Sequence, residues 1–594
     1  FRTTFINNEM NFKVFFYLFL LIHLLACNDI NDDKPNVLIF LTDDQGWGDL
    51  SINGNPNLST PNIDEIAKNG ARFERFYVSP VCSPTRAELL TGKFFVRSGV
   101  NGVTKGYERM NIDHQLISNF FKEKKYRTGL FGKWHNGSQP PYHPNSRGFE
   151  EFYGFTAGHW GNYFNPLLEK NGKIVKGKGY ISDDITNNAI SFIKKSKDPF
   201  FTYISYNTPH SPMQVPESYV SNKKVVKQGR YAEKENIRKT EAALGMVENL
   251  DYNVGKVIDS LKKYNLYNNT IIIFFSDNGP NGNRWNNDLK DKKGSTNEGG
   301  VRVPFFIQWP SKIKKGIKIN QITSVMDIFP TLVELTNNSS NIEFDGKSFN
   351  KYLESPNLKD NNRKIFSYWG NRISVRNNNF ILDNNDDLFD LNNDHKQEKP
   401  VNENFIDDYK ELKNAKDQWE NTLVDSFKKS NKRRRFTVNY TDLIDTHLPA
   451  RDAEITGSLK RSSIHANCSF IENWENEDDY IYWDIDVLSS GKSNVDLYYT
   501  LPENSIGTEI AIEYENQIIY KKIEDFHDPK LIGMNKDIVK RTESYTKEFK
   551  RINIGDLYFK KGESRLKIKT TKKMGQKSID FRLLILKKYS EKNI

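Results

Sequence analysis

The sequence feature that most constrains the fold is an alternation of short apolar runs with amphipathic helical patterns between residue 36 and about residue 340. Runs rich in β-branched and aromatic residues predict buried strands, and they occupy 36–41, 128–131, 200–204 and 270–275. Residues 60–67 and 240–261 have apolar positions at helical spacing. This order predicts an α/β domain in which helices flank a large, mixed but mainly parallel sheet.

The pattern changes twice further along the chain. Residues 341–430 predict a small α+β subdomain, with strands at 364–368 and 380–382 and a helix at 405–427. A basic, turn-prone stretch at 428–435 is typical of a linker. Beyond it, residues 431–594 alternate with period two and predict an appended β-sandwich. Its clearest strands are 480–487, 495–499, 564–568 and 579–583.

Composition and charge limit the classes of protein. With 594 residues, 37% of them hydrophobic and 27% charged, the chain can bury a sizeable core and is neither disordered, collagenous nor a polytopic membrane protein. Lysine and arginine number 86 against 76 acidic residues, so the formal net charge is +10. Such a surface favours polyanionic partners, and nucleic acid, an anionic membrane face and a sulfated polysaccharide all fit.

The N-terminal part predicts export. After Met10, residues 14–26 are uncharged and almost wholly apolar, but the run is shorter than the roughly 20 residues of a spanning helix. It ends Leu-Leu-Ala-Cys27, which resembles the lipobox of bacterial lipoproteins. This implies a signal peptide over 10–27, acylation of Cys27 and a lipid anchor in the outer membrane of a Gram-negative bacterium, on the periplasmic face or the cell surface. The alternative is an ordinary secretory signal.

Polar side chains follow two of the predicted strands directly. Asp43 and Asp44 come after 36–41, and Asp277 and Asn278 come after 270–275. The carboxyl ends of strands in an open α/β sheet share one edge, so these side chains are expected to converge. Oxygen ligands of this kind suit Ca²⁺ or Mg²⁺ better than Zn²⁺. The alternative is that they only cap helices and form turns.

Two other strand ends carry basic side chains. Lys133 and His135 follow the run at 128–131, and His210 follows the run at 200–204. Each histidine by itself is compatible with a structural hydrogen-bonding role.

Cys82 begins a predicted helix. Pro84 fits the first turn and Gly92 fits the C-terminal stop, so the unpaired N–H groups of the first turn point toward Cys82. Such a position favours an anion, and Arg86 offers a guanidinium suited to an oxyanion. An unmodified Cys82 fits either a low-pKa nucleophile or a buried apolar residue.

The stretch Cys82-Ser83-Pro84-Thr85-Arg86, followed by Leu-Leu-Thr-Gly92, resembles the signature of type I, formylglycine-dependent sulfatases. Further blocks resemble the same family in the same order, so the resemblance covers roughly residues 35–430. It implies an alkaline-phosphatase-like fold. The blocks are 36–49, 132–135, 208–210, 275–279, 293–304 and 388–394.

The resemblance also implies a set of site residues. Cys82 is implied to be oxidised to formylglycine (3-oxoalanine) by a formylglycine-generating enzyme and to lie near one Ca²⁺ ion. The implied calcium ligands are Asp43, Asp44, Asp277 and Asn278, and the implied sulfate-surrounding residues are Arg86, Lys133, His135, His210 and Lys293. Asp277 is implied to accept the attacking proton. His210 with Lys293 is implied to protonate the leaving oxygen, and His135 to assist sulfate release.

We therefore expect hydrolysis of sulfate esters on a sulfated polysaccharide or oligosaccharide, and no nucleic acid partner. The alternatives are a phosphate or phosphonate ester hydrolase of the same superfamily and an inactive glycan-binding lipoprotein. Members of the family often have one more polar side chain near the sulfate, and the corresponding position in this sequence is either Gly158 or His159. Residues in polar loops near the motifs are candidates for substrate selectivity: His159, Trp160, Asn162, Asn165, Arg284 and Trp285.

The predicted sandwich lies outside the resemblance. Trp474 and the run 480–483 loosely resemble carbohydrate-binding sandwiches. The alternative is that these aromatic residues fill the interior and that the sandwich packs on the catalytic part. We expect residues 35–430 to fold without it, unless it covers a large apolar surface.

Overall fold

The computed structural model describes residues 34–430 and 434–590. The predicted signal peptide and Cys27 lie outside these residues, and that prediction stays open. Within the described ranges, no helix combines the length and the apolar character that crossing a membrane requires.

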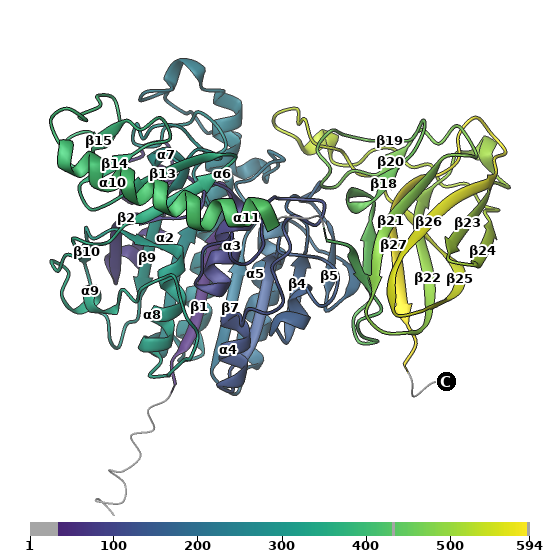
Figure 1. Cartoon of the computed structure of the whole chain (residues 1–594), viewed down its shortest axis with the longest axis horizontal. Helices are drawn as coiled ribbons and strands as arrows, with labels where there is room; N and C mark the ends of the chain where they lie inside the picture. The colour runs from purple at the N-terminus through teal and green to yellow at the C-terminus, as the bar shows by residue number, and fades with distance from the viewer. Residues whose placement is uncertain (1–33, 431–433, 591–594) are drawn as a thin grey trace, which may run out of the picture.

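Eleven strands form one large sheet (Figure 1). Its order is β10-β2-β9-β8-β1-β7-β3-β4-β5-β6, with β11 beside β2. The five strands β8, β1, β7, β3 and β4 are mutually parallel. This confirms the predicted α/β fold with a mainly parallel centre. The bounds are β1 Asn36–Thr42, β2 Ala71–Tyr77, β3 Arg127–Lys133, β4 Glu151–Phe155, β5 Leu167–Lys170, β6 Lys173–Lys176, β7 Phe200–Ser205, β8 Thr270–Ser276, β9 Arg302–Gln308, β10 Ile317–Ile319 and β11 Thr323–Ser324.

Both faces of this sheet are buried. Along β1, Ile39 belongs to one core cluster and Leu38 and Phe40 to the other, because neighbouring residues of a strand face opposite sides. One face is covered by α2 (Pro61–Lys68), α5 (Ile181–Lys195) and α6 (Ile237–Lys263). The other is covered by α3 (Cys82–Thr91), α4 (Ile117–Glu123), α8 (Ile328–Leu335) and α9 (Asn350–Glu354). The predicted helices at 60–67 and 240–261 are thus confirmed.

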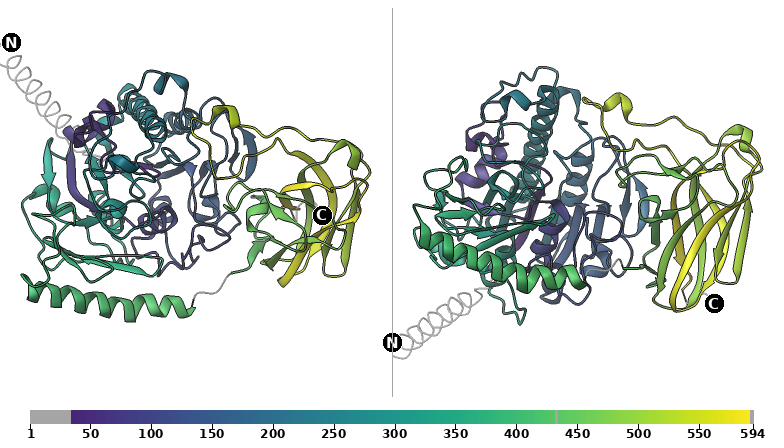
Figure 2. Two further views of the ribbon diagram at one scale, coloured as in Figure 1. Left: turned by 90° about the horizontal axis from the view of Figure 1, so that it is seen from above. Right: turned by 45° about the horizontal axis from the view of Figure 1, so that its top comes forward.

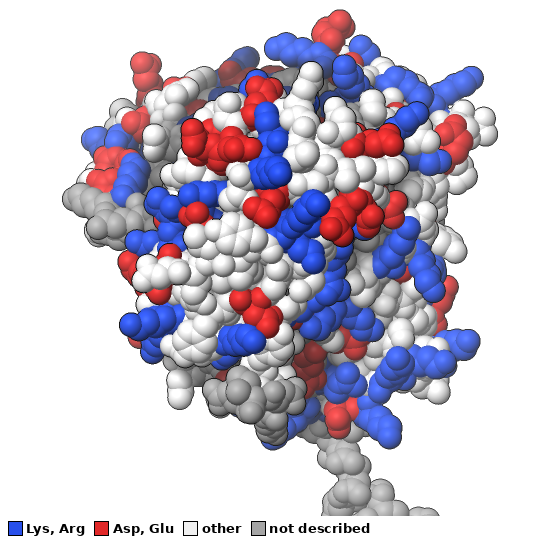
Figure 3. All heavy atoms as spheres, turned by 90° about the vertical axis from the view of Figure 1, so that its right-hand side faces the viewer, with Lys and Arg blue, Asp and Glu red and all other residues white. Residues whose placement is uncertain are grey.

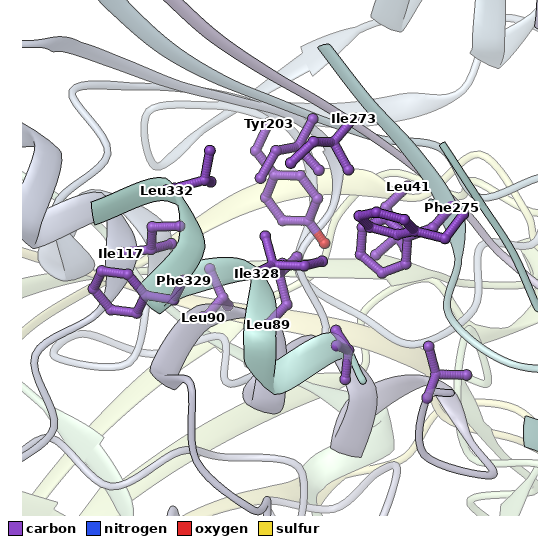
Figure 4. Packing of buried hydrophobic residues seen from close by; sticks show 14 of the residues in the cluster. Leu41, Leu89, Leu90, Ile117, Tyr203, Ile273, Phe275, Ile328, Phe329 and Leu332 are labelled. Atoms are coloured by element: carbon purple, nitrogen blue, oxygen red, sulfur yellow. The ribbon is translucent and has the colours of Figure 1, made fainter. Parts of the chain in front are cut away.

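Helix α3 is held firmly between the sheet and α8. Leu89 and Leu90 of α3 share a core cluster with Ile328 and Phe329 of α8 (Figure 4). Gly92 ends the helix with φ +66°, where a Cβ would come within 2.5 Å of a side-chain atom of Phe344. This packing fixes the position of Cys82 at the other end of the helix.

A four-stranded antiparallel sheet forms the smaller α+β unit. Its strands are β12 Ile365–Trp369, β13 Arg372–Arg376, β14 Phe380–Leu382 and β15 Leu388–Asp390. The predicted helix at 405–427 begins as α10 (Ile406–Trp419), passes through a π-helical turn (Glu420–Val424) and ends as α11 (Asp425–Ser430). The helix therefore includes the first residues of the stretch interpreted as a linker, because Val424 and Phe427 pack against the main core.

The C-terminal part is a β-sandwich of two six-stranded sheets around one core, as predicted. Trp474 and Trp483 are each 1% exposed, so these two indoles fill the interior and are not available to a glycan. Tyr480 and Tyr482 lie on the outer face. The strands are β16 Phe436–Val438, β17 Thr446–Pro449, β18 Glu454–Ile455, β19 Lys460–Arg461, β20 Ile471–Glu472, β21 Tyr480–Val487, β22 Gly491–Thr500, β23 Glu509–Tyr514, β24 Gln517–Lys522, β25 Lys550–Phe559, β26 Gly562–Lys572 and β27 Asp580–Lys588.

The outer surface of the sandwich carries charges of both signs. Arg565 lies 2.8 Å from Asp484, and Lys569 lies 2.8 Å from Glu513. On the face shown in Figure 3, lysine and arginine side chains lie among aspartate and glutamate side chains. The net positive charge of the chain is therefore not gathered into one basic surface there.

The sandwich contacts the large domain at several places. Residues 523–549 between β24 and β25, here called the bridging segment, extend from the sandwich toward α6 (Figure 2). Its Ile538 and Val539 pack with Met213 and Met246. Near the domain boundary, the buried guanidinium of Arg109 donates to the backbone carbonyls of residues 434 and 435, the latter at 2.6 Å.

We expect a chain that ends at Ser430 to be less stable than the full-length protein. It would remove the two carbonyl acceptors of Arg109 at residues 434 and 435, which costs about 1–3 kcal/mol, and leave only the bond from Nε to the Gly106 carbonyl. It would also expose the apolar surface under the bridging segment. Thermal unfolding and size-exclusion chromatography of the two chains measure the difference. Equal melting temperatures would contradict this and support an independent catalytic unit.

Candidate active site

Polar side chains follow five adjacent parallel strands and meet at one edge of the large sheet. Four of these strands were predicted from the sequence, and β4 was not. The strands supply the side chains from their carboxyl ends. They are Asp43 and Asp44 after β1, Asp277 and Asn278 after β8, His210 after β7, Lys133 and His135 at the end of β3, and His159 after β4.

Three buried carboxylates are each paired with a cation. Lys133 Nζ lies 2.6 Å from Asp43 Oδ2, and Lys293 Nζ lies 2.5 Å from Asp44 Oδ1. Arg86 Nη2 lies 2.8 Å from Asp277 Oδ2. These three pairs leave the site close to electrically neutral. A bound divalent cation would therefore make it a positive centre that attracts an anion.

Several oxygens in the site have no hydrogen-bond partner among the described residues. They are Asp43 Oδ1, Asp44 Oδ2 and Asn278 Oδ1, all buried. The Asn278 amide donates to Asp44 Oδ1 at 2.8 Å, which leaves its own oxygen free. Buried polar atoms are nearly always satisfied, so these three free oxygens are suited to be ligands of a cation. Hard oxygen ligands are those that Ca²⁺ prefers, and the residues present fit that ion.

Cys82 lies beside these oxygens. Its sulfur and one carboxylate oxygen each of Asp43 and Asp277 all lie within 4.8 Å of one another. The side chain is 4% exposed, and burial raises the pKa of the thiol above its usual value. An unmodified Cys82 would therefore stay protonated and would be a poor nucleophile.

The guanidinium of Arg86 is held by several protein groups of the site. Its guanidinium is fully buried and donates to Asp277, to the Lys133 carbonyl at 3.1 Å and to Ser205. Arg86 is therefore placed to orient Asp277. Burial and the neighbouring Asp43 raise the pKa of Asp277 to about 6.

The hydrogen bonds of two histidines fix their tautomers. His210 donates from Nδ1 to the Ser211 carbonyl at 2.7 Å, so Nε2, 3.8 Å from Asp44, carries the lone pair when the ring is neutral. His135 donates from Nε2 to the Val103 carbonyl at 2.8 Å, which leaves Nδ1 free. Burial lowers the pKa of His210 to about 4 and that of His135 well below its usual value.

The loop after β4 resolves the choice between Gly158 and His159. A Cβ at Gly158 would lie 2.1 Å from His135 Nε2, so this position excludes any side chain. His159 is buried, its ring lies 5.4 Å from the ring of His210, and neither of its nitrogens has a described partner. His159 is thus the residue that this loop brings to the site.

The structure does not bring the other selectivity candidates to this centre. Trp160, Asn162 and Asn165 line a separate cavity between the large domain and the sandwich. Arg284 is buried and bonded to Asp49 and to the Asp44 carbonyl, so its guanidinium is not free for a substrate. Trp285 is half-buried against Gly48.

One residue at the rim was missed from the sequence. Glu543 of the bridging segment accepts a hydrogen bond from Ser211 Oγ at 2.5 Å, directly beside His210. It lies 332 positions further along the chain, in a part without family motifs. No local pattern could have connected the two residues.

Comparison with known proteins adds independent information. Residues 35–338 match the family model described as Sulfatase, and residues 288–435 match the model described as N-sulphoglucosamine sulphohydrolase, C-terminal. The N-acetylgalactosamine-6-sulfatase of Mus musculus is 31% identical over 380 residues, which cover 57% of this chain and 69% of the relative.

Solved structures are also similar to this chain. The crystal structure of Ps i-CgsB in complex with k-i-k-neocarrahexaose is 32% identical with a TM-score of 0.60, covering 65% of this chain and 93% of the other. The phosphonate monoester hydrolase of Agrobacterium radiobacter is 19% identical with a TM-score of 0.50, covering 66% of this chain and 96% of the other. The latter likeness concerns the fold alone.

Proposed function

Since the chain belongs to the sulfatase family and is a sulfuric ester hydrolase, we propose that it removes sulfate groups from a sulfated polysaccharide or oligosaccharide. The observation that carries this proposal is the buried Cys82 at the start of α3, beside Asp43 and Asp277 at the carboxyl edge of the sheet. One relative is named for a sulfated amino sugar, and one neighbour is bound to a carrageenan oligosaccharide. Both support a glycan as the substrate.

Two groups complete the proposed site. Asp43, Asp44, Asp277 and Asn278 would hold Ca²⁺, which would neutralise charge on the sulfate oxygens. The formylglycine derived from Cys82 would supply, as its hydrate, a hydroxyl nucleophile that can be regenerated. The free oxygens described above support the metal. The placement of Cys82 beside them supports its role.

The remaining residues would manage protons and charge. Asp277 would accept the proton of the attacking hydroxyl, with Arg86 orienting it. Burial opposes the charge of Lys293, but Asp44 outweighs it and raises the pKa, so Lys293 stays protonated. With the Nε2 lone pair of His210 beside it, Lys293 is the better placed donor to the leaving oxygen.

His135 and Lys133 would act around the sulfate itself. The free Nδ1 of His135 can accept a proton when sulfate leaves, which fits the proposed role in release. Lys133 is held by Asp43 and would balance the charge of the bound ester. His159 would contact the sugar next to the scissile sulfate.

Maturation and location form a second part of the proposal. A formylglycine-generating enzyme would act on the segment that begins at Cys82, and the protein would be exported and anchored through a lipid on Cys27. The sequence at 10–27 supports the anchor. Labelling with a radioactive fatty acid would test it, and unlabelled protein would contradict it.

The test of the proposed activity compares two small esters. We expect kcat/KM for an aryl sulfate to exceed that for the matching aryl phosphate by at least about 10-fold, a difference of about 1.4 kcal/mol in transition-state binding. A preference for the phosphate would favour the phosphate or phosphonate hydrolase. Absence of turnover on both esters, and on sulfated oligosaccharides, would favour the inactive glycan-binding lipoprotein.

A further inference from the structure

A cavity of about 410 Å³ lies between the large domain and the sandwich. One wall comes from the loop after β4 and from β5 and β6, and the other from β17, β22, β27 and the bridging segment. Sites for small ligands span roughly 300–1,000 Å³, so the space suits one or two sugar units. Neither domain forms this cavity alone.

The cavity presents cations that have no carboxylate partner. Lys176 and Lys536 line it, and neither forms an ion pair within the described ranges. Lys536 Nζ lies 5.4 Å from the ring centre of Phe164. By contrast, Lys547 in the same wall lies 2.8 Å from Asp580 and is neutralised. The lining also holds the carboxylates of Glu169 and Glu548, but its lysine and arginine side chains outnumber them, so the cavity favours an anionic ligand.

Aromatic and amide groups complete the lining. Trp160 is half-buried and stacks on Phe155 at 5.0 Å, and Phe164 lies nearby under Lys536. Aromatic faces suit the C–H surfaces of a sugar ring, while Asn165 and Asn535 offer amides for hydroxyl groups. Together with the two lysines, this chemistry fits a sugar that carries a sulfate or a carboxylate.

The cavity adjoins the catalytic centre through one loop. His159 lies beside His210 in that centre, and the next residue, Trp160, lines the cavity. The catalytic centre and the cavity therefore lie on either side of the same loop.

We propose that this interdomain cavity binds a second, non-reacting anionic sugar unit of the substrate chain, with Lys176 and Lys536 as the contacts to its charged group. The inference rests on the proposed function, because it takes the ligand to be part of a sulfated glycan. It assigns the sandwich a direct share in substrate selection.

The test compares two double variants of the full chain. Lys176→Ala with Lys536→Ala removes the two cations, and Lys178→Ala with Lys530→Ala removes two exposed lysines from the same segments that do not line the cavity. Binding is measured by calorimetry in a Cys82→Ala background, with carrageenan and chondroitin sulfate hexasaccharides and their desulfated forms. The turnover of an aryl sulfate is measured in the Cys82 background.

We expect the first pair to weaken hexasaccharide binding about 10-fold or more while aryl sulfate turnover stays unchanged. The control pair should alter neither. Equal binding by the two variants, equal binding of the carrageenan hexasaccharide after desulfation has removed its charge, or no hexasaccharide binding at all would overturn the inference. If the protein without substitutions did not turn over the aryl sulfate, the proposed function itself would be refuted. The two failures are therefore distinguishable.

Discussion

Replacing Cys82 with alanine is expected to reduce sulfate ester hydrolysis by roughly 10⁴-fold or more, because removal of a nucleophile eliminates the covalent route. The fold should survive, since Leu89 and Leu90 still anchor α3 in the core. Mass spectrometry of active protein, made together with a formylglycine-generating enzyme, should find an aldehyde at position 82.

The matched control is the other buried cysteine of the described residues. Cys468 donates from its sulfur to the His159 carbonyl at 2.9 Å and lies in the sandwich. Cys468→Ala should keep most of the aryl sulfate turnover. A fully active enzyme whose Cys82 peptide contains only a free thiol would refute the proposed maturation.

The second large effect is expected for Asp43→Asn. The substitution removes one anionic oxygen from the proposed calcium site, and we expect the affinity for the metal to fall at least about 100-fold, more than is typical when a residue that only supports a ligand is changed. Activity should collapse at low calcium and recover in part with excess calcium. Elemental analysis and activity titrations with Ca²⁺ measure both.

Asp49→Asn separates this effect from simple destabilisation. Both aspartates are fully buried and paired with a cation, Asp43 with Lys133 at 2.6 Å and Asp49 with Arg284 at 2.7 Å. Only Asp43 also has a free oxygen in the site. The Asp49 variant should retain its metal. Equal metal content in the two variants, or no metal in the parent protein, would contradict the site.

The catalytic cluster was predictable because parallel strands leave no choice about where their ends lie. Once 36–41, 128–131, 200–204 and 270–275 are strands of one sheet, the residues that follow them must share an edge. The order of the strands in the sheet was not needed for this. The strands themselves were indicated by short runs rich in β-branched and aromatic residues.

Features that depend on side-chain direction were not predictable. Arg86 lies within a sequence motif and Arg284 lies close to one. The sequence does not show that Arg86 pairs with Asp277 and Arg284 with Asp49, because these pairs form only in the packed fold. Likewise, the loop after β4 has one side at the catalytic centre and the other at the interdomain cavity. His159 and Trp160 are neighbours in sequence, yet His159 lies beside His210 in the catalytic centre and Trp160 lines the interdomain cavity.

Contacts between the domains could not be predicted from the sequence either. Glu543 reaches Ser211 only because the bridging segment folds across α6, and nothing in residues 523–549 resembles a motif. The stretch at 428–435 was interpreted as a linker, although its first residues belong to a helix. Its charge and polarity are typical of a linker, but apolar contacts of Phe427 extend the helix into it.

If Cys82 is oxidised as proposed, its burial would set an order of events during biogenesis. In the folded protein the side chain is 4% exposed and sits at the start of a helix whose other end is locked in the core. A modifying enzyme needs an accessible, extended segment, so oxidation would have to be complete before this part of the chain folds. Protein that folds first would remain permanently immature, and adding the modifying enzyme afterwards would not rescue it.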